Sequence, residues 1–169
     1  MADAKIKYRA TNQTITISPA SLASDTALLA GRESTAIDNT TNLDIDALVA
    51  GFITVGTTPT IDTIIEGWVY ATYDGGTNYP DTLDGTDSAE TLNSAGIKAS
   101  ALARGFVLDV DETTSDQVYY VKPFSIAVLF GGILPIKWGL FVVHNTGVNL
   151  KSLAGDHELN YDAIQYQSV

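Results

Sequence analysis

Asp109 and Asp111 are the first candidates for chemistry, because they stand two residues apart in a run that alternates apolar and polar side chains. In a β-strand this spacing places both carboxylates on one face, where a pair could hydrolyse glycosides or bind calcium. Leu108 and Val110 lie on the opposite face and belong to the core, and nothing nearby supplies an acid of raised pKa. We therefore interpret the pair as the solvated side of a strand.

The chain contains two histidines, His144 and His157, and no cysteine. Cysteine nucleophiles and thiolate zinc sites are excluded, and a Ser-His-Asp triad would need one of the histidines. We expect His144 to pack or cap a strand end, and His157, between two acidic residues, to lie in a solvated loop with a raised pKa. Residues 51–57 lack the lysine of a phosphate-binding loop. We expect no enzyme: no catalytic residue, no cofactor and no metal site.

An acidic, glycine-rich stretch covers residues 74–87. It could surround a calcium ion with carboxylates and carbonyls, but its spacing departs from the EF-hand pattern. We expect a solvated surface loop, with calcium as the open alternative. Tyr73 and Tyr79 are the aromatic residues expected to be exposed, and exposed aromatic rings on a β-sandwich can stack on sugars. Trp68 and Trp138 share their strand faces with apolar residues and are expected in the core.

Three of the nine cations, Lys5, Lys7 and Arg9, occupy alternate positions of one strand face at residues 4–10. A basic edge strand on an acidic protein protects an unpaired edge from aggregation. It could also dock on an acidic partner. Both interpretations stay open, and the three residues are the candidate partner-binding site.

Length and charge limit the remaining function classes. The 169 residues suit one domain, 1–169, and 9 basic against 20 acidic residues give a formal net charge of −11. Such a surface repels phosphate backbones and anionic lipid, so we expect neither nucleic acid nor membrane as a partner. The apolar stretch 124–143 contains Gly131-Gly132, Pro135 and Lys137, which fit two buried strands and a turn better than a membrane helix.

Threonine, valine, isoleucine and tyrosine dominate the composition, which favours β-strands. The apolar pattern and the turn residues predict about eight strands. One long connection, 74–104, can hold a short helix starting at Asp87, and a second short helix could start at Ser18-Pro19. We expect an all-β, antiparallel two-sheet β-sandwich that is jelly-roll-like. The segments expected to form strands are 5–9, which lies within the N-terminal basic strand 4–10, and 14–17, 28–37, 45–55, 64–73, 106–111, 118–130, 136–144 and 159–166.

Residues 28–39, 80–87 and especially 123–147 resemble small structural proteins of tailed bacteriophages and prophages. The resemblance implies a virion protein with a jelly-roll-like fold: a capsid decoration or cement protein that stabilises the head by binding across major capsid subunits. It also implies a homo-oligomer, a dimer or trimer, made in the bacterial host cytoplasm and located on the capsid exterior. It transfers no functional residues to this chain.

A second hypothesis is a tail- or fibre-associated module that binds a host receptor or glycan. Under this alternative, Tyr73 and Tyr79 of the long loop would contact the sugar. The residues do not decide between head and tail.

Overall fold

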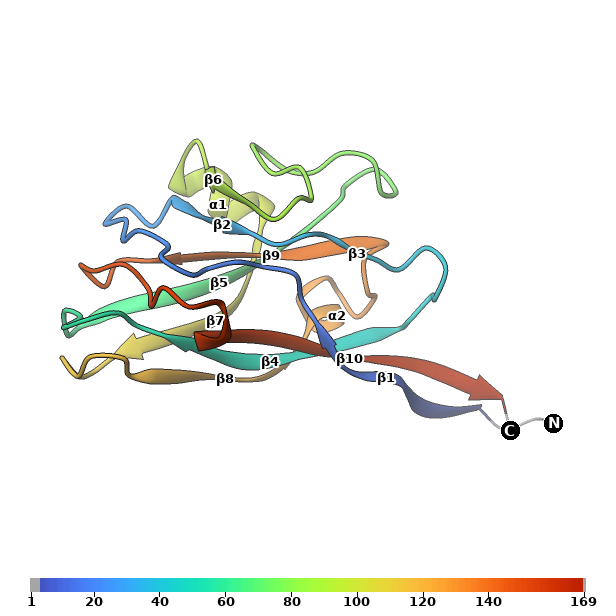
Figure 1. Cartoon of the computed structure of the whole chain (residues 1–169). Helices are drawn as coiled ribbons and strands as arrows, with labels where there is room; N and C mark the ends of the chain where they lie inside the picture. The colour runs from blue at the N-terminus through green and yellow to red at the C-terminus, as the bar shows by residue number, and fades with distance from the viewer. Residues whose placement is uncertain (1–3, 169) are drawn as a thin grey trace.

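The computed structural model describes residues 4–168, which form ten strands, two short α-helices and one 3-10 turn (Figure 1). The strands are β1 (Ala4–Thr14), β2 (Ala30–Glu33), β3 (Ile37–Asp38), β4 (Asp46–Thr54), β5 (Thr63–Ala71), β6 (Ser88–Thr91), β7 (Ala103–Val110), β8 (Val118–Ser125), β9 (Lys137–His144) and β10 (His157–Ser168). The helices are α1 (Ala95–Ala101) and α2 (Ile126–Leu129), and the 3-10 turn is η1 (Ala154–Asp156).

The strands form two antiparallel sheets that pack face to face. The first sheet, sheet A, has the order β1-β10-β4-β8, and the second, sheet B, has the order β6-β2-β9-β5-β7, with β3 also paired to β9. The strand pairs are nested in the sequence: the first strand pairs with the last, and each later pair lies inside the one before it. The pairs are β1–β10, β2–β9, β4–β8 and β5–β7. This is the pairing of a jelly roll. The prediction of an all-β, antiparallel two-sheet sandwich is confirmed.

The main hydrophobic core lies between the two sheets. Strand β9, which is central in sheet B, contributes Trp138, Leu140 and Val142 to it. Trp138 of β9 is fully buried and packs edge-on against Tyr161 of β10, with ring centroids 5.5 Å apart. The prediction that Trp138 belongs to the core is confirmed.

A second hydrophobic layer covers the outer face of sheet B. Trp68 and Tyr70 of β5 and Phe141 of β9 pack there beneath the long connection between β5 and β7. Leu83, Leu92 and Leu102 of that connection supply the covering side chains. Strand β5 is therefore buried on both faces, which explains why its sequence is apolar on both faces. Trp68 is buried as predicted, but in this outer layer.

Two expected strands are shorter than their apolar runs. Strand β8 ends at Ser125, because the Ser125 hydroxyl accepts a hydrogen bond from the amide of Val128 and caps α2. The carboxylate of Asp46 accepts from the Ser125 hydroxyl and the Ala127 amide and fixes this turn. The expected strand 28–37 is divided into β2 and β3. Between them, the hydroxyl of Ser34 accepts a hydrogen bond from the Leu140 amide and interrupts the backbone pairing.

The long connection holds one short helix, as predicted, but this helix does not start at Asp87, and the helix expected at Ser18-Pro19 is absent. Asp87 does not start a helix, since its carboxylate binds Arg32 and Ser18, and the next four residues form the edge strand β6. Helix α1 begins later, where the Ser94 hydroxyl accepts from the Ile97 amide. At Ser18-Pro19 the chain makes a turn and no helix. The predicted strand 14–17 is likewise absent beyond Thr14, where β1 ends.

The first and last strands project together beyond the sandwich (Figure 1). Strand β4 follows β10 only as far as the pair Ile164 and Asp46, whereas β1 pairs with β10 to Ser168. Residues 4–8 and 164–168 thus form a two-stranded ribbon, which we call the arm.

Replacing Gly139 with alanine should destabilise the outer layer. A Cβ at Gly139 would lie 2.3 Å from the Tyr70 ring, whose hydroxyl is fixed by a 2.6 Å hydrogen bond to the Ser34 carbonyl. We expect a loss of about 1–3 kcal/mol in the free energy of unfolding, measured with urea. Gly155→Ala is the control, because nothing lies within 4 Å of that position. Equal losses in both variants would contradict the close packing.

Candidate functional site

Lys5 and Lys7 lie on the arm and are exposed to solvent. Strand β1 is the terminal strand of sheet A, so the prediction of a basic edge strand is confirmed. The two lysines lie opposite Gln167 and Gln165 of β10, which carry no charge. Among the residues that the structure describes, neither lysine forms an ion pair. Their charges are therefore available to an acidic partner.

The charge of Arg9, in contrast, is not available to an acidic partner. The pairing of β1 with β10 is irregular between Tyr8 and Ala10, so Arg9 is an inserted residue and leaves the face of the two lysines. Its guanidinium donates two hydrogen bonds to Asp44, with Nε–Oδ1 at 2.6 Å and Nη2–Oδ2 at 2.7 Å. The Asp44 side chain is only 6% exposed. Arg9 is therefore committed to its own chain, and the expected row of three free cations contains two.

The two tyrosines assigned to a glycan site have different surroundings. Tyr73 is 73% exposed near the start of the long connection. The ring of Tyr79 packs edge-on against Tyr70, with centroids 5.7 Å apart, and covers Gly85. Burial raises the pKa of the Tyr79 hydroxyl. Of these two tyrosines, Tyr73 is the one whose ring is exposed.

The carboxylates of the acidic loop 74–87 bond to groups of the same chain. Asp74 accepts from the amides of Thr77 and Asn78, and these hydrogen bonds lower its pKa. Asp84 accepts from the amide two residues later, and Asp87 holds Arg32 with a 2.6 Å Nε–Oδ1 contact. Within residues 4–168 no three or more histidine, aspartate or glutamate side chains gather in a group that could hold a metal ion.

His157 is not a solvated loop residue, and the predicted rise of its pKa is wrong. Its Nδ1 accepts from the Thr54 amide and its Nε2 donates to the Lys151 carbonyl at 2.9 Å. Burial lowers its pKa, and this effect outweighs the hydrogen bond to Lys151 and the charge of Asp156, which both raise it. His144 is fully buried at the end of β9, as expected, and burial lowers its pKa too. Both are neutral structural groups.

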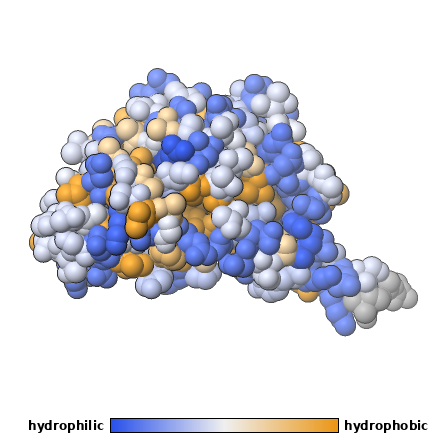
Figure 2. Space-filling model, viewed as in Figure 1, coloured by the Kyte–Doolittle hydropathy of each residue, from blue (hydrophilic) through white to orange (hydrophobic). Residues whose placement is uncertain are grey.

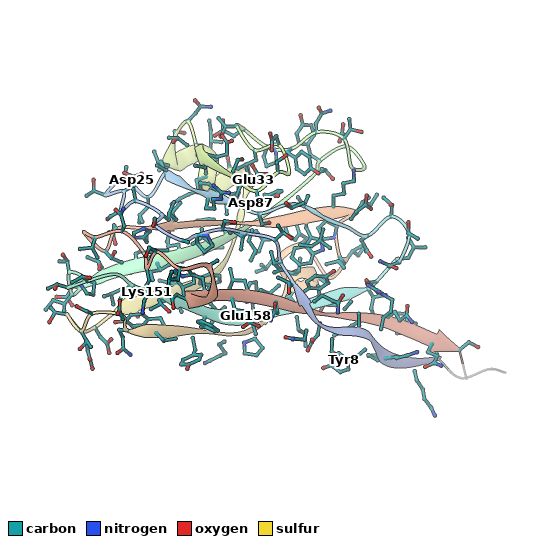
Figure 3. The ribbon with its side chains drawn as sticks, in the orientation of Figure 1. Tyr8, Asp25, Glu33, Asp87, Lys151 and Glu158 are labelled. Atoms are coloured by element: carbon teal, nitrogen blue, oxygen red, sulfur yellow. The ribbon has the colours of Figure 1, made fainter. Side chains whose placement is uncertain are left out.

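Glu33 is a buried carboxylate that the sequence did not single out. It is fully buried, and it accepts hydrogen bonds from the amides of Asp84 at 3.1 Å and Gly85 at 2.6 Å. Burial raises its pKa despite these donors. Figure 3 labels Glu33 and Asp87 where the long connection meets β2. Together the two carboxylates fasten the acidic loop to sheet B.

Glu66 and Lys98 form a second buried polar contact under α1. The Lys98 Nζ lies 3.1 Å from Glu66 Oε2 and 2.7 Å from the Leu28 carbonyl oxygen, and it stands over the Trp68 ring at 4.9 Å. Burial would raise the pKa of Glu66, but hydrogen bonds from Trp68 and Lys98 lower it. Both charges have partners inside the protein, so the contact anchors α1. A lysine within the sequence of a short amphipathic helix gave no signal of this burial.

Comparisons of the chain with protein-family models, with curated proteins and with solved structures give no match. No helix within residues 4–168 is long and apolar enough to cross a membrane.

Asp109 and Asp111 are exposed, as the interpretation of a solvated strand side predicts. Of the site residues that the sequence singled out, Lys5, Lys7 and Tyr73 are exposed and form no ion pair among the described residues.

The two buried histidines should make stability depend on pH. Their folded-state pKa values are lowered below 6.5, so the unfolded chain binds protons first as the pH falls. Stability is complete above pH 6.5 and declines below it, by at most about 1.4 kcal/mol per pH unit for each histidine. Urea unfolding between pH 7.5 and 6.0 measures this slope, above the range in which carboxylates of ordinary pKa titrate. Burial raises the pKa of Glu33, which contributes a slope of opposite sign, so the difference between the native protein and the His157→Gln variant isolates the histidine contribution. His157→Gln should reduce the slope, and a flat profile in the native protein would contradict the account.

Arg9→Ser should cost stability, whereas Lys5→Ser with Lys7→Ser should not. Removing Arg9 leaves the buried carboxylate of Asp44 without its ion-pair partner. Hydrogen bonds between charged groups contribute about 1.5–3 kcal/mol to the free energy of unfolding. The exposed lysines should change the free energy of unfolding by less than about 0.5 kcal/mol. Thermal and urea unfolding measure both. Equal stability of the two variants would show that the Arg9–Asp44 pair contributes nothing.

Proposed function

We propose that this chain is a structural protein of a tailed-phage virion: a capsid decoration or cement protein that binds on the exterior across major capsid subunits. The observation that carries the proposal is the projecting arm, whose two free lysines extend from an otherwise acidic body. An arm of this kind can reach a neighbouring subunit while the body rests on another. The sequence resemblance to phage structural proteins supports the same assignment.

The internal chemistry is compatible with a structural role. The buried charged groups Glu33, Glu66 and Lys98 are all engaged in holding the outer layer on sheet B. A negative exterior suits a position outside the shell, away from packaged DNA. By adding contact area across subunit boundaries, the protein would raise the barrier to shell rupture. We propose no enzymatic activity and no nucleic-acid or membrane partner.

Tyr73 favours the second candidate, a tail- or fibre-associated receptor- or glycan-binding module. Its ring is exposed at the edge of the long connection and has room to stack on a sugar. Mass spectrometry of purified heads and tails, with copy number per particle, separates the two candidates. Hundreds of copies on heads support decoration. A few copies on tails would transfer the proposal to host recognition, with Tyr73 as the residue to substitute.

The double variant Lys5→Ser with Lys7→Ser should bind capsids more weakly. Exposed ion pairs contribute about 0.2–1 kcal/mol each, so the dissociation constant should rise by about 2- to 30-fold, most at low salt. Occupancy on purified heads that lack the protein measures this. Lys122→Ser, which removes an exposed lysine from β8, is the matched control. Unchanged occupancy of the double variant would exclude the arm lysines as docking groups.

A further inference from the structure

A groove lies at the edge of the sandwich opposite to β1. The last strand of sheet A, β8, and the last strand of sheet B, β7, lie beside each other at this edge. Residues 105–108 of β7 and residues 120 and 122–124 of β8 line the groove, and its volume is about 390 Å³. Ligand sites typically measure about 300–1,000 Å³, so the groove is large enough for a small ligand.

The deepest part of the groove is apolar. Phe106 is buried and Phe124 half-buried, their ring centroids lie 6.1 Å apart, and both rings pack in the main core between the sheets. A Cβ at Gly105 would lie 2.7 Å from the Phe124 ring, so a residue without a side chain is needed there. The main core therefore comes close to solvent between the two edge strands.

Each of the two edge strands contains an inserted residue where it borders the groove. In the pairing of β7 with β5 the inserted residue is Gly105, and in the pairing of β8 with β4 both Lys122 and Pro123 oppose Ala50. Such bulges redirect side chains and are common beside functional sites. A bulge, a lysine and a proline without an N–H also oppose the pairing of a further strand with an edge. The groove therefore suits a compact ligand better than an extended peptide.

The rim of the groove carries an aromatic ring and a positive charge. Tyr120 is 75% exposed, and the ring of Phe52 supports it from one side with the centroids 6.2 Å apart. Lys122 is exposed and forms no ion pair among the described residues. Every other described lysine or arginine outside the arm forms at least one ion pair. The charge of Lys122 is thus left for a negatively charged ligand.

We propose that this groove binds a carboxylate-bearing sugar residue of an otherwise neutral glycan. A sugar ring has an apolar face of C–H groups, which can stack on Tyr120, and its carboxylate can accept charge-assisted hydrogen bonds from Lys122. Its hydroxyls stay hydrated at the exposed rim, whereas a fatty acid would leave much of its apolar chain in water. One lysine matches one carboxylate, and the net charge of −11 repels a polyanion such as a polysulfated glycan.

The groove is separate from the residues assigned to the proposed functions. Strands β1 and β8 are opposite edges of sheet A, so the arm lysines are not part of it. Tyr73, the residue of the receptor-binding alternative, does not line it either. In the view of Figure 2 the projecting end is mostly hydrophilic, whereas hydrophobic residues reach the surface over the body. The glycan site does not rest on the capsid proposal, and each can fail without the other.

An NMR titration of the isotope-labelled chain tests the site. The probe is an oligosaccharide in which one glucuronic acid residue is flanked by neutral sugars, added up to about 10 mM so that a dissociation constant of about 1 mM is measurable. We expect chemical-shift changes confined to β7, β8 and the adjoining part of β4. Tyr120→Ser should raise the dissociation constant about fivefold or more, because the stacking is lost. Lys122→Ser should raise it by about two- to fivefold at low salt.

Two matched variants separate this site from general effects of the substitutions. Tyr73→Ser removes a tyrosine of nearly equal exposure, 73% against 75% for Tyr120, and Lys7→Ser removes another exposed lysine. Neither variant should change the affinity. Tyr120 and Lys122 are exposed, so their variants should keep the native melting temperature.

The methyl ester of the probe carries no charge, so the native chain should bind it about as weakly as Lys122→Ser binds the acid. The proposal is overturned if the acid does not bind, if the ester binds as tightly as the acid, or if a polysulfated glycan binds more tightly than either. It is also overturned if Tyr73→Ser abolishes binding and Tyr120→Ser does not, because the sugar would then lie at the long connection.

Discussion

Burial of sheet B on both faces is the constraint on which the rest of the structure depends. Strands β5 and β9 carry large apolar side chains toward the main core and also toward the outside, where Trp68, Tyr70 and Phe141 would otherwise meet water. Burying an aromatic side chain removes about 150–250 Å² from solvent, so these rings require a cover. The long connection between β5 and β7 provides it. The most irregular part of the chain therefore exists to complete a hydrophobic layer.

Covering sheet B buries polar groups that need hydrogen-bond partners, and this need determines where the buried charges lie. The connection brings backbone amides and a lysine into the protein, and each needs a partner. Glu33 accepts hydrogen bonds from amides of the loop, and Glu66 accepts a hydrogen bond from the Lys98 side chain of α1. The buried ionisable groups therefore hold the long connection on sheet B through hydrogen bonds and an ion pair.

The sequence predicted the features that follow from local periodicity. Alternation placed Trp68 and Trp138 among apolar residues, and both are buried. It failed where a distant residue decides the local structure. Asp87 resembled a helix start but is held by Arg32, fifty-five residues away, and β8 ends where Asp46 binds the next turn. His157 looked solvated because its burial depends on Thr54 and Lys151, which only the fold brings to it.

The arm shows the same limit for the candidate site. Alternation at residues 4–10 correctly indicated a basic edge strand, but the inserted residue in its pairing with β10 diverts Arg9 to Asp44. That diversion has a structural consequence, because the ion pair ties the base of the arm to the turn that carries Leu43. Arg9 thereby anchors the base of the arm, while Lys5, Lys7, Ile6 and Tyr8 remain exposed. A single strand therefore has two parts: a base that is anchored by an ion pair, and a projecting end with a basic face and an apolar face.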